Sequence, residues 1–170
     1  MEEKTNVMRL LDQVRAPYVP HFYKPDSGLT GTQIAAILGE PAATVFKTLV
    51  AQGKSGAFYA FLIPVAMELD LKLAAKAAGE KAIAMLPLKK LLPVTGYVHG
   101  GCSPIGMKKR MRHFIDETSS GCERISFSGG RVGAQVTMTT DTALEVADLE
   151  VAPLAKKTVQ ESMGVPNDMV

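Results

Sequence analysis

The sequence has no tryptophan, and aromatic residues make up only 6% of its 170 positions. A buried core must therefore be built mainly from Ala, Val, Leu, Ile and Met. Its two cysteines, Cys102 and Cys122, match no CxxC spacing, so neither a zinc site nor a dithiol redox site is indicated. We do not expect a disulfide between them, because intracellular compartments keep thiols reduced.

Long apolar runs are also missing. None approaches the roughly 20 residues that a membrane-spanning helix needs. The first residues, MEEKTNVMRLL, begin acidic and become amphipathic, whereas a signal peptide begins basic and continues apolar. We therefore expect a cytoplasmic protein that does not associate with a membrane.

The composition that is present is ordinary for a globular protein. Hydrophobic residues make up 46% and charged residues 21%, with a formal net charge of +2. A nucleic-acid site would have to come from local clustering of basic residues. The length suits one domain. We predict one compact domain over residues 1–157 and a polar, frayed tail over residues 158–170.

Apolar periodicity and capping residues predict the secondary structure. Helices are expected over residues 7–14 after Thr5 or Asn6, 32–38 before Gly39, 70–78 before Gly79, 88–92 between two prolines, and 140–147. Strands are expected over residues 21–23, 45–51, 57–65, 82–85, 96–99, 112–116, 124–128 and 134–138, with residues 149–154 extended. Because strands and helices do not alternate regularly, this order predicts an α+β domain with a mixed sheet.

Two glycine-rich loops are the most informative segments: HGGCSPIG (residues 99–106) and SGGRVG (residues 128–133). Adjacent glycines let the backbone approach a ligand and turn several N–H groups toward it, so either loop can hold an oxyanion or a phosphate oxygen. Each loop can equally be a tight connection between two strands. Neither matches GxGxxG before a helix or GxxxxGK[ST], so no nucleotide cofactor is indicated.

Lys47 lies within the predicted strand VFKTLV (residues 45–50) and shares one face with Val45 and Leu49. An unpaired ammonium group is costly to bury, so the side chain must reach water, a carboxylate or an anionic ligand. An edge-strand lysine that reaches water and a functional lysine both fit this pattern.

Basic residues flank the first glycine loop. Lys89 and Lys90 precede it, and a second group follows it directly: Lys108, Lys109, Arg110 and Arg112. Beside a ligand cleft such a group can bind a phosphate backbone with salt-dependent affinity. The same group can also be a solvated face with no ligand.

The sequence offers no convincing protein nucleophile and no metal site. Cys102 lies in the first loop, but no Cys–His–Asn arrangement can be assembled around it. The histidines at positions 21, 99 and 113 are scattered and form no HExxH-like spacing. His99 borders the loop and can act either as a base or as a hydrogen-bonded structural residue. Ser103 lacks a GxSxG context.

The motifs taken together resemble the YbaK/EbsC branch of the YbaK/prolyl-tRNA-synthetase-associated editing domains. The resemblance runs from about Thr5 to Lys156 and keeps both order and spacing. Five segments carry it: VFKTLV (45–50), IPVAMELDLKLAAKAAG (63–79), TGYVHGGCSPIGMKKR (95–110), FID (114–116) and SGG (128–130).

The resemblance implies a single α+β domain with a mixed, partly barrel-like sheet flanked by helices. It also implies a hydrolase that removes a wrong amino acid from tRNA, with cysteinyl-tRNA(Pro) as substrate and the substrate's own thiol as nucleophile. No metal or cofactor is implied. Mischarged tRNA(Pro) is the expected partner, and prolyl-tRNA synthetase is a candidate protein partner. A deacylase for another small residue such as alanine, or a non-catalytic tRNA-binding module, remains an alternative.

The family pattern also implies roles for residues of this chain. Lys47 matches the essential lysine, and the GGxSPxG loop supplies further catalytic positions at Gly100, Gly101 and Ser103. Positions implied to bind substrate are Tyr23, Thr30, Ser128, Gly129 and Gln135. The basic residues that follow the loop, Lys108, Lys109, Arg110 and Arg112, are implied to contact tRNA.

The chain departs from the family pattern at a few positions. Thr30 stands where an aromatic residue is frequent, and Gln135 is the neutral choice at a position shared with Asp. Arg131-Val132-Gly133 replaces KRG and so lacks one basic side chain. These differences bear on the substrate more than on the fold.

Overall fold

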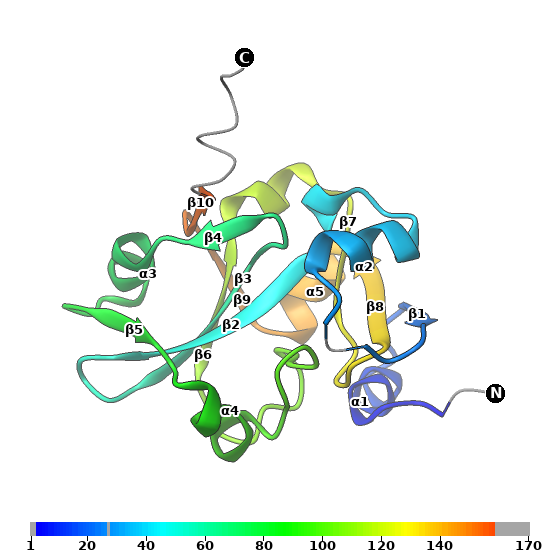
Figure 1. The fold of residues 1–170 in the computed structure, drawn as a ribbon, viewed down its shortest axis with the longest axis horizontal. Coiled ribbons are helices and arrows are strands. Elements are labelled where there is room, and N and C mark those ends of the chain that lie inside the picture. The colour runs from blue at the N-terminus through cyan, green and yellow to red at the C-terminus, as the bar shows by residue number, and fades with distance from the viewer. Residues whose placement is uncertain (1–2, 27, 159–170) are drawn as a thin grey trace.

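The computed structural model describes residues 3–26 and 28–158. Of the predicted tail, only Thr158 lies within the described residues. A five-stranded sheet crosses the middle of the molecule (Figure 1). Its strands, in spatial order, are β5 (Ile83–Met85), β2 (Phe46–Gly53), β3 (Phe58–Pro64), β6 (Arg112–Asp116) and β9 (Leu149–Ala152). The pairs β3–β6 and β6–β9 are parallel and the others antiparallel, which confirms the mixed sheet.

A second, antiparallel sheet has three strands: β1 (Val19–Phe22), β8 (Ala134–Thr139) and β7 (Arg124–Ser128), with β8 in the centre. A single parallel bridge between Val45 and Ser126 joins it to the start of β2. A short pair, β4 (Met67–Leu69) with β10 (Ala155–Lys157), lies beside the larger sheet. The two larger sheets are therefore joined at this one bridge without closing into a barrel, which agrees with a partly barrel-like arrangement.

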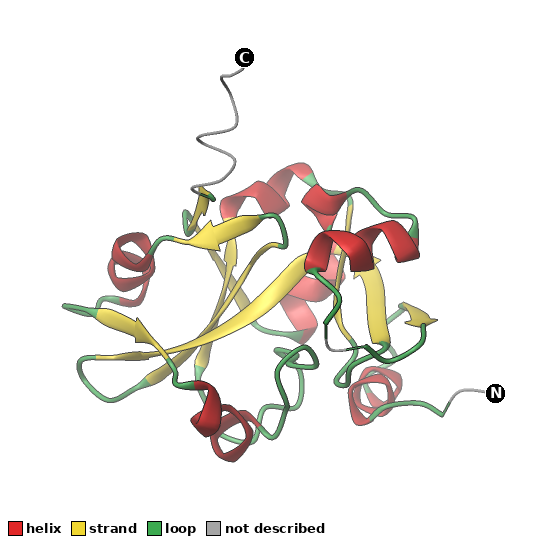
Figure 2. Ribbon diagram, in the orientation of Figure 1, coloured by secondary structure: helices red, strands yellow, loops and turns green. Residues whose placement is uncertain are grey.

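The helices are short and flank the sheets (Figure 2). They are α1 (Asn6–Gln13), α2 (Gly31–Leu38), α3 (Leu71–Ala78), α4 (Leu88–Thr95) and α5 (Thr140–Val146), with 3₁₀ turns η1 (Ala42–Thr44) and η2 (Glu117–Gly121). Thr5 caps α1, because its side chain accepts a hydrogen bond from Met8 N. Asp70 caps α3, and Gly79 ends it in the left-handed conformation, as the sequence predicted.

The central strands of the five-stranded sheet divide their side chains between two apolar clusters. Leu62 and Ile115 face the larger cluster, which includes α1, α5 and the three-stranded sheet. Phe61 and Phe114 face the other cluster, which is covered by α3; their rings stack with centroids 5.4 Å apart. The sheet is thus buried on both sides at its centre, which explains the continuous apolar run in β3.

The strand predicted over residues 96–99 is wrong. Gly96 has φ of 82° and is the C-cap of α4. Tyr97 N then donates a hydrogen bond to Thr95 Oγ1 at 3.0 Å, which turns the chain away from an extended path. The first glycine loop therefore joins a helix to a strand, whereas the second joins strands β7 and β8 as expected. Within the described residues, no helix is both long and apolar enough to cross a membrane.

Candidate functional site

A pocket of about 200 Å³ opens beside β2 at an edge that no described strand covers. β5 pairs only with Ala51–Gly53, and the bridge to β7 reaches the chain only at Val45. At this edge Val50 O accepts a hydrogen bond from Leu86 N. Because backbone groups alternate along a strand, those of Thr48 point to the same edge. The pocket therefore has as one wall a stretch of strand backbone that no described strand pairs with on this edge.

The pocket wall is mostly apolar with a few polar groups, which is typical of small-ligand sites. Its apolar side chains come from Leu29, Ile34, Val45, Phe46, Leu49, Val65 and Leu91. Its polar side chains are Lys47, Thr48, His99, Cys102, Ser128 and Gln135, and Gly31 and Gly100 complete the wall. Four residues predicted to form the site, Lys47, Gly100, Ser128 and Gln135, thus meet at one cavity from distant parts of the chain.

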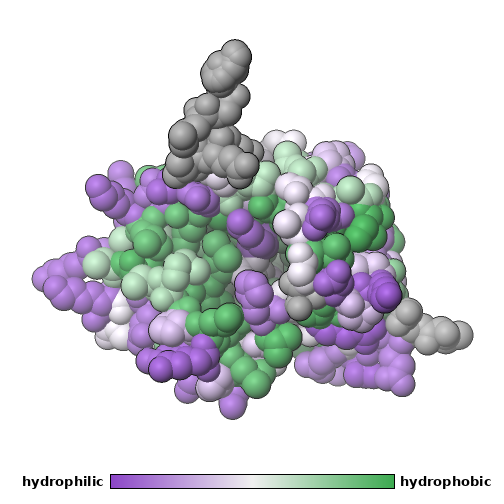
Figure 3. All heavy atoms as spheres, viewed as in Figure 1, coloured by the Kyte–Doolittle hydropathy of each residue, from purple (hydrophilic) through white to green (hydrophobic). Residues whose placement is uncertain are grey.

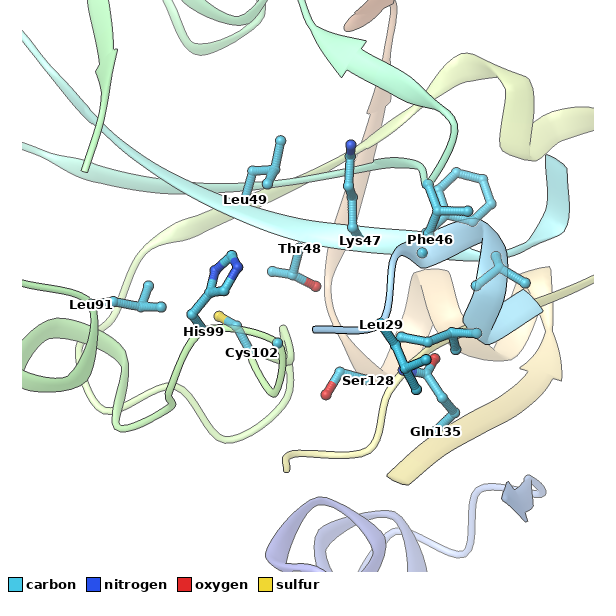
Figure 4. Close-up of a pocket in the computed structure, with 15 residues that line it drawn as sticks. Leu29, Phe46, Lys47, Thr48, Leu49, Leu91, His99, Cys102, Ser128 and Gln135 are labelled. Atoms are coloured by element: carbon cyan, nitrogen blue, oxygen red, sulfur yellow. The ribbon is translucent and has the colours of Figure 1, made fainter. Parts of the chain in front are cut away.

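Lys47 and Thr48 lie on opposite sides of β2. Figure 4 shows Lys47 and Leu49 projecting to one side, and Thr48 to the side of Cys102 and Ser128. The pocket includes both sides because it wraps around the uncovered edge of the strand. The Lys47 ammonium group forms no ion pair with any described residue. Burial lowers the pKa of Lys47, and the charge of Glu68 opposes that shift only partly.

Two residues of the first glycine loop, Gly100 and Cys102, line the pocket. Gly100 has φ of 87°, a conformation that favours glycine. Gly101 N donates to Val98 O at 3.0 Å and is already paired. Among the described atoms, the N–H groups of Gly100 and Cys102 have no hydrogen-bond partner. Because Gly100 and Cys102 also line the pocket, their N–H groups are candidate donors for an anion there.

Gly101 and Ser103 hold the first glycine loop in its conformation. A Cβ atom on Gly101 would lie 2.9 Å from Arg131 Cα and 3.0 Å from Val132 N, so the two glycine loops pack backbone to backbone there. Ser103 is fully buried, and its hydroxyl accepts a hydrogen bond from Ile105 N. Neither residue lines the pocket.

The second glycine loop places Ser128 and Gln135 opposite each other on β7 and β8. Ser128 Oγ accepts a hydrogen bond from Gly130 N at 3.1 Å, and Gly129 N donates to Ala134 O at 2.8 Å. Gly129 therefore holds the β7–β8 turn and does not itself line the pocket.

Tyr23 influences the pocket through Gln135. Burial raises the pKa of Tyr23, and hydrogen bonds with the Gln135 side chain and the Gly133 backbone offset part of that shift. Tyr23 N also donates to Gly133 O at 3.0 Å. Tyr23 thus orients the Gln135 amide without lining the cavity itself.

Two buried polar atoms in the pocket wall lack a partner within the described structure: Thr48 Oγ1 and Gln135 Oε1. A buried oxygen without a hydrogen bond costs about 1–3 kcal/mol, so a ligand that pairs with it gains affinity. Gln135 was predicted from the sequence, and Thr48 was not. Thr48 lies next to Lys47 on β2, at an edge of the strand that no described strand covers. Only the fold shows that this edge is uncovered, so the sequence alone did not indicate Thr48.

Cys102 lies in the pocket wall and is 8% exposed. Burial raises the pKa of its thiol to about 12. The group is therefore protonated near neutral pH, and a thiol is a far weaker nucleophile than a thiolate. Among the described residues, no group of three His, Cys, Asp or Glu is placed to bind a metal ion.

Comparison with known proteins fits this geometry. A family model described as "Aminoacyl-tRNA editing domain" matches residues 27–146, which include all 15 residues that line the pocket. The chain belongs to this family. It is 37% identical over 157 residues to an Enterococcus faecalis protein named "Putative Cys-tRNA(Pro)/Cys-tRNA(Cys) deacylase EbsC", covering 92% of this chain and 96% of that protein.

Solved structures share the editing-domain fold. A protein described as "hypothetical protein APE2540" has a TM-score of 0.81 at 22% identity, covering 89% of this chain and all of the other. A second, described as "a putative trans-editing enzyme for prolyl tRNA synthetase", has a TM-score of 0.77 at 24% identity and covers 91% and 99% of the two chains. At these identities the likeness establishes the fold alone.

The remaining predicted residues of the editing domain lie outside the pocket. Thr30 is the N-cap of α2: its Oγ1 accepts a hydrogen bond from Gln33 N, and Gln33 Oε1 accepts one from Thr30 N. Its neighbours Leu29 and Gly31 line the pocket instead. Thr30 therefore positions this wall of the site through the helix that it starts.

Arg112 is separated from the other basic residues. Its guanidinium group forms a two-point ion pair with Glu150, with Nη2 2.8 Å from Oε1, and lies 4.9 Å from the centroid of the Phe114 ring. Arg112 pairs with Tyr59 on β3, whereas Lys47 pairs with Ile63 near the opposite end of that strand. In contrast, the Lys108–Arg110 segment is exposed and follows the glycine loop directly.

Proposed function

We propose that this protein deacylates mischarged aminoacyl-tRNA by breaking its ester bond, with cysteinyl-tRNA(Pro) as its substrate. One observation carries the proposal: Lys47, the Gly100 backbone and Ser128 meet in one pocket of an aminoacyl-tRNA editing domain. The name of the Enterococcus faecalis relative supports cysteine as the amino acid. The volume, about 200 Å³, lies below the roughly 300–1,000 Å³ of sites for drug-sized ligands and suits a small aminoacyl group.

Lys47 binds the phosphate of the terminal nucleotide. Its ammonium group lies on the side of β2 away from Ser128, and is therefore separated from the part of the pocket that holds the amino acid. A half-buried cation without an ion pair among the described residues is suited to an anionic ligand, since the ligand's charge offsets the cost of burial. Binding the phosphate fixes the ester relative to the first glycine loop.

The amino acid binds between Thr48, Ser128 and Gln135. The unpartnered Gln135 Oε1 accepts a hydrogen bond from the α-ammonium group, and Tyr23 holds the amide in that orientation. Thr48 Oγ1 is the second unpartnered oxygen and pairs with a donor of the same substrate. A site with buried polar groups rejects ligands that leave those groups unpaired.

The substrate's own thiol is the nucleophile. Its sulfur attacks the ester carbonyl carbon, and the bond between that carbon and the ribose oxygen breaks. The thiol proton passes to the ribose oxygen, so the products are a cyclic thioester and tRNA with a free hydroxyl group. The N–H groups of Gly100 and Cys102 stabilise the negative charge that develops on the carbonyl oxygen. The high pKa of Cys102 supports this assignment over a protein thiolate.

The trans-editing name of one structural relative makes prolyl-tRNA synthetase the candidate protein partner. In this arrangement the synthetase contributes tRNA selectivity, because the pocket itself binds only the aminoacyl end. The other predicted positions, Gly101, Ser103, Thr30 and Gly129, shape the walls of the pocket.

A panel of cysteine, alanine and serine esters on tRNA(Pro) tests the proposal. We expect the cysteine ester to be deacylated at least about tenfold faster than the other two, since only its thiol attacks efficiently. Cys102→Ala should retain most of this activity. Equal rates for the alanine and cysteine esters would contradict the thiol mechanism and would favour water activated by His99. Loss of activity in Cys102→Ala would identify a protein nucleophile instead.

A further inference from the structure

Charge is unevenly distributed along this chain. Between Glu80 and Asp116 there is no acidic residue, but there are seven basic ones: Lys81, Lys89, Lys90, Lys108, Lys109, Arg110 and Arg112. The rest of the chain holds 12 basic and 17 acidic residues, a formal charge of −5, whereas this segment alone carries +7. A net charge of +2 therefore conceals a strongly basic segment.

The fold gathers most of these cations around α4. Lys89 and Lys90 lie in its first turn, and Lys108 N and Lys109 N donate to Thr95 O and Val94 O at its last turn. Both groups are exposed, and neither forms an ion pair with a described residue. Arg112 is excluded from this surface by its ion pair with Glu150. The helix, about 12 Å long, thus has unpaired cations at both ends.

The position of Lys89 and Lys90 does not stabilise the helix. Cations in the first turn are opposed by the helix dipole by about 0.3–1 kcal/mol each, and Pro87 provides no side-chain cap. Cations beside the last turn, such as Lys108 and Lys109, do favour the helix. The charges of the first pair therefore do not stabilise the helix, which favours a role in binding an anion.

α4 also exposes apolar side chains. Leu88 is 66% exposed and Leu92 54%, and they are one helical turn apart. Met85 before the helix and Val98 after it are exposed as well. Figure 3 shows hydrophobic and hydrophilic surface side by side over α4, in the lower part of the view. This combination suits an anionic polymer that carries apolar faces, as unstacked nucleotides do.

The same helix borders the pocket. Leu91 of α4 lines the cavity, and so do His99 and Gly100, which follow the helix. A nucleotide chain whose last residue occupies the pocket has to leave it past one of its walls. Exposed cations lie at both ends of the α4 wall without an ion pair to any described residue, and the segment from Lys81 to Ile115 holds no carboxylate.

We propose that α4 and the Lys108–Arg110 segment form the binding surface for the single-stranded 3′ end of the tRNA, with phosphates on Lys89, Lys90 and Lys108–Arg110 and unstacked bases on Leu88 and Leu92. This inference rests on the proposed function for the identity of the RNA. It adds Lys89, Lys90 and two leucines to the tRNA contacts and removes Arg112 from them.

Binding of an uncharged RNA hairpin tests the surface independently of catalysis. The hairpin carries a single-stranded 3′ overhang, and a blunt hairpin of the same sequence is the comparison. We expect wild-type protein to bind the overhang hairpin more tightly than the blunt one. The double variant Lys89→Gln/Lys90→Gln should weaken binding of the overhang hairpin by about tenfold or more. It should also lower the slope of log K against log salt by about 1.4, the value for two lost single-strand phosphate contacts.

The matched control is Lys72→Gln/Lys76→Gln, which removes two exposed cations from α3. Its affinity should stay within about twofold of wild type. Equal losses in both double variants would overturn the inference, because only net charge would then matter. An equal loss for the overhang and blunt hairpins would also overturn it, in favour of duplex binding. Unchanged RNA binding combined with lost binding to prolyl-tRNA synthetase would assign α4 to a protein partner instead.

The two proposals can fail separately. If wild-type protein binds the overhang hairpin through Lys89 and Lys90 but does not deacylate cysteinyl-tRNA(Pro), the surface stands and the substrate assignment fails. If it deacylates the ester and the Lys89→Gln/Lys90→Gln variant shows an unchanged KM for the full tRNA, the surface assignment fails alone.

Discussion

Lys47 illustrates how a single side chain relates stability to function. Its ammonium group is half-buried, lines the pocket and has no ion pair among the described residues. Burial lowers its pKa, so the folded state holds this proton less tightly than the unfolded chain does. In the free protein the charge therefore costs stability near neutral pH. Such a cost is common where a binding site is prepared for an oppositely charged ligand.

Replacing Lys47 with Met should lower the deacylation rate by about 10²–10³-fold, as expected when one electrostatic contact to the substrate is removed. The same change should leave the free energy of unfolding unchanged or raise it. Chemical unfolding and single-turnover deacylation measure the two effects. If Lys47→Met lowered the free energy of unfolding and the loss of stability accounted for the loss of activity, a binding role for Lys47 would be contradicted.

The lowered pKa of Lys47 also predicts a pH dependence. As pH rises, the ammonium group of Lys47 loses its charge at a pH below 10.5, the pKa of an ordinary lysine. Affinity for an amide-linked, non-hydrolysable cysteinyl-tRNA analogue should therefore fall at a lower pH than it would if an exposed lysine made the contact. Lys47→Arg should shift this loss to higher pH, because the guanidinium group stays charged. An identical profile in both proteins would assign the titration to another group.

At the scale of elements, the site depends on how closely the two glycine loops approach each other. The first loop follows α4 and the second joins β7 to β8, and their backbones touch at Gly101 and Arg131. This contact holds Gly100 and Ser128 at the same pocket. Both loops are recognisable as candidates from their glycines, but no local sequence pattern shows that they face one cavity.

Gly101→Ala should separate the loops, because its Cβ would lie 2.9 Å from Arg131 Cα, and backbone cannot move aside cheaply. We expect a loss of about 1–3 kcal/mol in the free energy of unfolding and a fall in deacylation rate. Gly121→Ala is the matched control, since a Cβ there meets nothing within 4 Å. It should change stability by less than about 0.5 kcal/mol. Full activity in Gly101→Ala would show that the loop contact is not needed.

Secondary structure was predictable where local chemistry decides it. The Thr5 and Asp70 caps and the left-handed Gly39 and Gly79 set helix ends by contacts within a few residues. The prediction of a strand over residues 96–99 is wrong because Gly96 is the left-handed C-cap of α4 and does not begin an extended segment. β4 and β10 were not predicted, since each has three residues and is defined by pairing with the other across the fold.

At the scale of the whole molecule, Asp116 connects the C-terminal strands to the central sheet. It is 2% exposed, and its Oδ1 accepts hydrogen bonds from Leu154 N and Ala155 N at 2.8 Å. Oδ2 accepts one from Thr118 N at 3.1 Å. Burial by itself would raise the pKa of Asp116, but the hydrogen bonds with these three residues outweigh it and leave the pKa lowered. The carboxylate therefore stabilises the fold in its charged form.

Asp116→Asn should cost about 1–3 kcal/mol at neutral pH, because its NH₂ group would face an N–H donor on one side. The stabilisation by the carboxylate is present above the ordinary value of 3.8 and is lost as pH falls through the lowered folded pKa. Urea unfolding at pH 7 and below pH 4 should show a steeper acid loss in wild type than in the variant. Glu123→Gln, an exposed position, should retain the wild-type profile.

The sequence by itself determined the family, the helix caps, the central strands and the residue types of the site, because these depend on local spacing and ordered motifs. Only the tertiary structure decided which of those residues share a pocket. It did so by leaving one edge of β2 uncovered and by packing two loops at Gly101. It also paired Arg112 with Glu150 and gathered around α4 cations that have no ion pair with a described residue. These features depend on contacts between segments far apart in the chain, so no local pattern encodes them.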